Sequence, residues 1–132
     1  MAKHRPDTLR ILAAALLLLV GAVHFQQYVT TLGHVPTIGV LFLLNAAGAA
    51  ALTIALFSAE PTLRLLALPA ALGLVIGALI SIVLAMNGGI FGYQEPTFRT
   101  SVTIAIIAEV AAIPALIACA LSELHRIRST PA

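Results

Sequence analysis

The chain has 132 residues, of which 61% are hydrophobic and only 9% are charged. Soluble domains carry about a quarter charged residues, so this composition excludes an ordinary soluble protein and predicts that the chain resides in a lipid bilayer. The basic ends of the chain are too short for a nucleic-acid site, so no nucleic-acid partner is expected. The single Cys119 excludes an intramolecular disulfide and a cysteine-rich metal site.

The positions of the charged residues predict four membrane-spanning helices. Residues 11–59 and 65–94 contain no charged side chain, and a helix needs about 20 apolar residues to cross a membrane. The first stretch is therefore long enough for two spans, and the second for one span and a loop. One more apolar run follows Arg99, interrupted only by Glu109. We expect spans over residues 9–28, 37–57, 64–86 and 100–122.

The connections between these spans carry turn-forming residues. The segment 29–36, "VTTLGHVP", contains a glycine and a proline, which break helices. Residues 58–62, "SAEPT", predict a tight hairpin, and residues 87–99, "NGGIFGYQEPTFR", predict a longer loop. The predicted fold is an all-α four-helix transmembrane bundle that forms one integral membrane domain over residues 1–132.

Lysine and arginine concentrate on the cytoplasmic side of membrane proteins. One side of the predicted bundle carries six of these residues, whereas the other carries only Arg99. The N- and C-termini are therefore expected in the cytoplasm, with the loops of residues 29–36 and 87–99 outside the plasma membrane. Residues 1–22 also have the basic start, apolar stretch and small-residue end of a signal peptide, whose removal would leave three spans. The six residues are Lys3, Arg5, Arg10, Arg64, Arg126 and Arg128.

Small residues predict where the helices pack. In membranes, helices associate through close contacts between small side chains. Gly73, Gly77 and Ser81 recur at intervals of four on one face of the third span. We expect this face to pack inside the bundle, with a seam between two copies of the chain as the alternative. Gly21 on the first span also permits a close neighbour.

Three polar side chains are predicted to lie at a similar depth in the outer half of the bundle. At 1.5 Å per residue, Glu109 and Asn45 lie about 12–13 Å below the outer surface and His24 about 6 Å below it. Gln27 and Tyr28 follow His24 at i+3 and i+4, so they share its helix face. The sequence therefore predicts an intramembrane polar pocket formed by these five residues.

Three interpretations of this pocket remain open. A charged acid in lipid is costly, so intramembrane acids usually face the protein interior. Glu109 could form a hydrogen-bonded clamp with His24 or Asn45, or belong to a ligand or proton site, or face the lipid in its protonated form. No ligand spacing enforces a metal or haem site at His24, His34 and Glu109. No catalytic residue, metal ligand or cofactor is assigned.

Two segments carry a resemblance to known proteins. They are "RILAAALLLLVGAVHFQQY" (10–28) and "VPTIGVLFLLNAAG" (35–48). They resemble small four-span membrane proteins that are common in actinobacteria and, more loosely, DoxX-like proteins. The resemblance to DoxX-like proteins implies membrane redox and quinone or thiol chemistry, although a single cysteine speaks against thiol chemistry. The matching positions are Gly21, His24, Pro36, Gly39 and Asn45.

The sequence thus favours a non-catalytic membrane protein with an outward-facing polar pocket. This protein would be a small binding module or an accessory subunit, and its partners would be the lipid bilayer and a larger membrane complex or a homo-oligomer. One alternative is a DoxX-like, quinone-linked redox protein. The other is a proton-coupled carrier of small solutes that uses Glu109.

Overall fold

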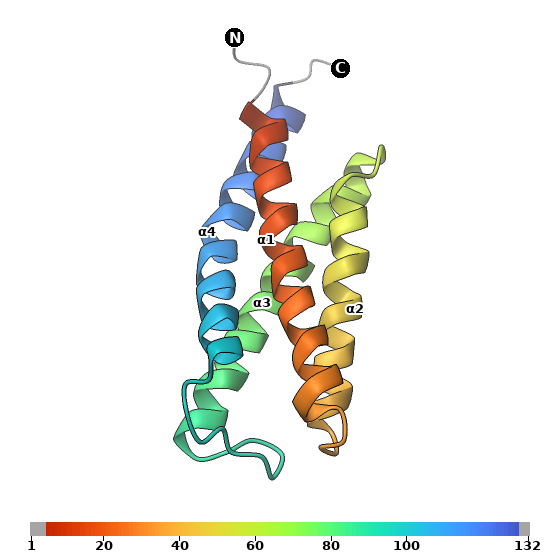
Figure 1. Cartoon of the computed structure of the whole chain (residues 1–132). Helices are drawn as coiled ribbons and strands as arrows, with labels where there is room; N and C mark the ends of the chain where they lie inside the picture. Colours follow the sequence, from red (N-terminus) through yellow and green to blue (C-terminus); the bar gives the residue numbers. More distant parts are fainter. Residues whose placement is uncertain (1–4, 130–132) are drawn as a thin grey trace.

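The computed structural model describes residues 5–129, which form four long helices (Figure 1). Each helix is long and apolar enough to cross a membrane, and the predicted all-α four-helix bundle is confirmed. The helices are α1 (Arg5–Gln27), α2 (Ile38–Leu56), α3 (Pro61–Asn87) and α4 (Thr100–Arg128), with a short π-helical turn, η2 (Tyr28–Leu32), after α1.

The two ends of the bundle differ in their connections. The start of α1, the end of α4 and the connection between α2 and α3 lie at one end, which we call the terminal end (Figure 1). The turn after η2 and the loop of residues 88–99 lie at the other, the loop end. α1 packs against both α2 and α4, whereas α2 and α3 separate toward the loop end (Figure 1).

Several helix boundaries differ from the predicted spans, and α1 already begins at Arg5, four residues before its predicted start. The first helix continues past residue 28 as a π-helical turn, in which the amide of Gly33 donates to the carbonyl oxygen of Tyr28 (2.8 Å). α3 begins earlier, at Pro61, where the side chain of Glu60 accepts a hydrogen bond from Thr62 N (3.3 Å). α4 runs six residues past its predicted end at 122, because the polar segment "SELHRIR" continues the same helix.

The interior and the surface of the bundle are both apolar. Alanines and a few larger residues such as Leu17, Leu68 and Leu116 fill the interior. Large apolar side chains such as Ile54 and Leu66 also project outward from the helices. Monomeric soluble proteins rarely expose extensive apolar surface, so these outer faces fit acyl chains.

Glycines differ in how closely they approach another helix. A Cβ atom added to Gly21 would lie 2.8 Å from the Cβ of Ala49, so α1 and α2 are in close contact there. A Cβ added to Gly73 or Gly77 would meet no neighbouring atom within 4 Å. The predicted close packing at the third span is therefore absent within the described chain, because α3 turns this face toward its gap with α2. Ser81 bonds along its own helix, to the carbonyl oxygen of Gly77 (2.8 Å).

Candidate functional site

A cleft of about 400 Å³ lies between α2 and α3 in the half of the bundle nearer the loop end. α1 and η2 close its inner side, and the 88–99 loop covers one end. Most of its lining residues are apolar. Small-molecule sites measure about 300–1,000 Å³ and combine apolar walls with a few polar groups, so this cleft has the size and lining of such a site. Its polar residues are His24, Gln27, Asn45, Ser81, Tyr93 and Glu95.

The cleft opens between two membrane-spanning helices. Leu41 and Leu44 of α2 line it and are exposed, as are Gly73 and Gly77 of α3. Since α2 and α3 are both long enough to cross the membrane, this opening faces lipid. The two glycines have no side chains, so the α3 side of the opening stays unobstructed.

His24 of α1 and Glu109 of α4 face each other inside the bundle. His24 Nε2 lies 3.8 Å from Glu109 Oε1, which is an ion-pair distance and too long for a hydrogen bond. Glu109 is 0% exposed, and neither of its carboxylate oxygens has a hydrogen-bond partner within residues 5–129. This burial excludes the lipid-facing interpretation. The His24 ring also packs on Phe42 of α2, with ring centroids 4.9 Å apart.

The backbone contact of His24 restricts where its protons lie. Nδ1 is 2.9 Å from the carbonyl oxygen of Val20, and a carbonyl oxygen only accepts, so Nδ1 carries a hydrogen. Nε2 then carries a hydrogen only in the imidazolium form. A buried carboxylate without a positive partner is costly. Burial therefore favours the two neutral forms of the pair, which are imidazole beside carboxylic acid and imidazolium beside carboxylate.

The structure brings most of the predicted pocket together. Asn45 lines the same cleft as His24 and Gln27, and its Oδ1 is buried without a hydrogen-bond partner. Glu109 lies next to His24 without lining the cleft. The residues that the sequence places in the outer half of the bundle thus either contact one another or line the same cleft.

Tyr28 lies outside this cleft. It does not line the cavity, and its ring packs beside that of Phe25, with centroids 6.4 Å apart. The backbone stays α-helical up to Gln27, so the side-chain direction of Tyr28, toward Phe25 and Gly33, keeps its ring out of the cleft. The predicted pocket therefore contains one residue whose side chain lies elsewhere.

At the loop end, Glu95 is held by two side chains. It accepts hydrogen bonds from the hydroxyl of Tyr93 (2.6 Å) and from Nε and Nη2 of Arg99 (2.9 and 2.6 Å). Burial raises the pKa of Glu95, but the hydrogen bonds from Arg99 and Tyr93 and the Arg99 charge hold it below its usual value. Burial and the Glu95 carboxylate raise the pKa of Tyr93 to about 12. At neutral pH this trio therefore carries one negative and one positive charge.

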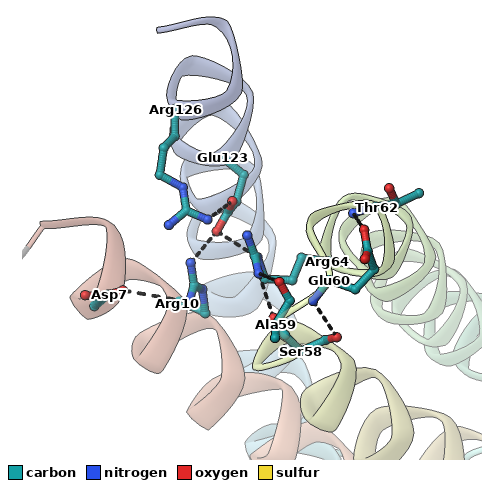
Figure 2. A network of polar contacts seen from close by, with 9 residues as sticks. All are labelled: Asp7, Arg10, Ser58, Ala59, Glu60, Thr62, Arg64, Glu123 and Arg126. Atoms are coloured by element: carbon teal, nitrogen blue, oxygen red, sulfur yellow. Dashed lines mark hydrogen bonds and ion pairs between the residues drawn. The ribbon is translucent and has the colours of Figure 1, made fainter. Parts of the chain in front are cut away.

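At the terminal end, one carboxylate joins three helices (Figure 2). Glu123 of α4 accepts a short hydrogen bond from Arg10 of α1 and another from Arg126 (2.7 Å). Arg64 of α3 places Nε 3.5 Å from the same carboxylate. Nη1 of Arg64 also donates to two carbonyl oxygens of the α2–α3 connection (2.6 and 3.2 Å). We call these four residues the arginine cluster.

Sequence reasoning missed both of these ionic groups. The count of basic residues includes Arg99 without its partner, although Glu95 precedes it by four residues and this spacing allows contact. Glu123 lies at the same depth as Arg10 and Arg64 at the predicted span ends, and this shared depth was the available signal. The rule used to predict the orientation in the membrane counts lysines and arginines but does not consider the acidic residues near them.

Neither a metal site nor a relative identifies the function. Within residues 5–129, no group of three or more His, Cys, Asp and Glu side chains is arranged to hold a metal ion. No protein-family model, curated protein or solved structure matches the chain. The cleft and the neighbouring His24–Glu109 pair are therefore the features on which a function can be argued.

Proposed function

We propose that this protein is a non-catalytic binding protein of the plasma membrane whose cleft takes a lipid-soluble small molecule. The observation that carries this proposal is the cleft of about 400 Å³, with apolar walls, a lateral opening and a few polar groups. We further propose that the terminal end is cytoplasmic, because five of the six Lys and Arg residues within residues 5–129 belong to that end. In this orientation the cleft lies in the outer half of the membrane.

The test is native mass spectrometry of gently purified protein, together with an absorption spectrum. We expect wild-type protein to retain a bound small molecule and Gly77→Trp to retain at least tenfold less, because the indole would occupy the open side of the cleft. Leu84→Trp is the matched control, since Leu84 is an exposed α3 residue outside the cleft. Absence of any bound molecule, or equal retention by Gly77→Trp, would contradict the proposal.

The same measurement separates the related proposals. An accessory subunit would carry the mass of a larger membrane partner, and a homo-oligomer would show a multiple of the chain mass. A bound molecule that absorbs visible or near-ultraviolet light would support the quinone-linked redox alternative, which rests on the DoxX-like resemblance.

A second candidate function is a proton-coupled carrier, favoured by the buried, titratable His24–Glu109 pair beside the cleft. In proteoliposomes, an imposed pH gradient is expected to drive uptake of the solute. Glu109→Gln is expected to abolish this uptake while the protein stays folded, because a glutamine amide still forms hydrogen bonds but does not take up a proton. Uptake that continues unchanged in Glu109→Gln would exclude this candidate.

A further inference from the structure

The charged groups around the cleft are already compensated. Glu95 is paired with Arg99 and receives a hydrogen bond from Tyr93. His24 and Glu109 form a buried acid–base pair 3.8 Å apart, and burial favours the net-neutral forms of such a pair. A charged group brought into the cleft would therefore lose its water without gaining an opposite charge, which is unfavourable.

Two carboxamides in the cleft have unused hydrogen-bonding capacity. Gln27 lines the cleft, is only 3% exposed and makes no side-chain hydrogen bond within residues 5–129. Asn45 lines the same cleft and has a buried, unpartnered Oδ1. A buried polar group without a partner is destabilising, and each carboxamide both donates and accepts. A ligand that satisfies them must do the same, and a hydroxyl or an amide has this property.

The opening of the cleft determines where the remainder of such a ligand lies. Exposed Leu41 and Leu44 stand on one side, and Gly73 and Gly77 on the other. A hydrocarbon chain leaving the cleft would pass between these residues into the acyl chains of the bilayer. The two carboxamides, of Gln27 and Asn45, lie deeper in the cleft, next to α1.

We propose that the cleft binds an uncharged lipid whose head group is a hydroxyl or an amide, such as a long-chain alcohol or a monoacylglycerol. This inference rests on the proposed binding function and specifies its ligand class. The head group bonds to Gln27 and Asn45, and the tail extends between α2 and α3. Phospholipids, whose head groups are charged, are excluded from the deep part of the cleft.

The test uses the full-length protein in lipid nanodiscs and two photoreactive probes with the same diazirine-bearing tail. One probe is a long-chain alcohol and the other is the corresponding alkyl phosphate. We expect the alcohol to label cleft peptides of α2 and α3 at least tenfold more than the phosphate at equal concentration. An excess of unlabelled alcohol, but not of alkyl phosphate, is expected to compete; this comparison needs no variant.

Variants then locate the head group. Gln27→Met and Asn45→Leu are each expected to reduce labelling by the alcohol about tenfold, which corresponds to the loss of one well-formed hydrogen bond. Gln26→Leu is the matched control, because Gln26 is exposed, bonds to Thr30 and does not line the cleft. Its labelling is expected to stay at the wild-type level.

The outcomes distinguish a wrong ligand class from a wrong binding function. Equal labelling of the cleft by both probes, or wild-type labelling in both Gln27→Met and Asn45→Leu, would overturn the ligand class and leave the binding function intact. Absence of cleft labelling by either probe would overturn the inference, and together with the absence of any bound molecule in native mass spectrometry it would overturn the binding function as well.

Discussion

Replacing Glu123 with leucine is expected to lower the free energy of unfolding by about 3–5 kcal/mol, the cost of breaking a buried ion pair from one side. Arg64 is only 8% exposed, and Glu123→Leu would leave it facing Arg10 without an intervening carboxylate. The change would also remove the only side chain through which α1, α3 and α4 are joined in the arginine cluster. The loss is measurable by detergent-denaturation titration of the purified protein.

Asp7→Asn is the matched control for Glu123→Leu. Asp7 also pairs with Arg10, at 3.7 Å, but its side chain is 63% exposed, so its removal is expected to cost no more than about 1 kcal/mol. The double variant Glu123→Leu with Arg64→Met is expected to cost less than the sum of the two single changes, because the two residues contact each other. Strict additivity, or equal losses for Glu123→Leu and Asp7→Asn, would contradict the assigned role of Glu123.

Gly21→Leu is expected to destabilise the bundle by about 3 kcal/mol, the upper end of the usual range for overpacking. The first added carbon would already lie 2.8 Å from Ala49 Cβ and 3.4 Å from the backbone oxygen of Ala46. α2 must therefore move away from α1 to accommodate a leucine. Thermal unfolding in detergent, followed by circular dichroism, measures the effect.

Gly77→Leu is the matched glycine substitution, and it is expected to leave the unfolding temperature at or above that of the wild type. An added side chain at this position meets open space, and leucine favours helix over glycine by several tenths of a kcal/mol. If Gly77→Leu proved as destabilising as Gly21→Leu, α3 would have to pack more closely against another helix than it does here.

The fold was predictable because uninterrupted apolar runs and helix length are properties of the sequence alone. Depth was predictable for the same reason: each helical residue advances by a fixed 1.5 Å, so His24, Asn45 and Glu109 could be assigned to similar levels. Side-chain direction at the helix end was less predictable. The ring of Tyr28 lies beside Phe25 and outside the cleft, and its spacing from His24 does not encode this side-chain direction.

The distance between neighbouring helices was not predictable from small residues. Gly21 and Gly77 are both compatible with close packing, yet only Gly21 contacts a neighbouring helix closely. The spacing of Gly73 and Gly77 indicates a smooth helix surface, and such a surface suits a tight interface and the open side of a cleft equally well. The separation of α2 from α3 depends on tertiary contacts at both ends, which a local pattern does not encode.

α3 is held at one end and contains a proline close to that end. Arg64 anchors it at the terminal end, and Pro69, which cannot donate a backbone hydrogen bond, follows within two helical turns. From Pro69 to Asn87 the helix extends about 27 Å at 1.5 Å per residue. A rotation of about 5° at the proline would therefore move the far tip by about 2 Å. A bend near the anchored end would therefore change the width of the lateral opening of the cleft.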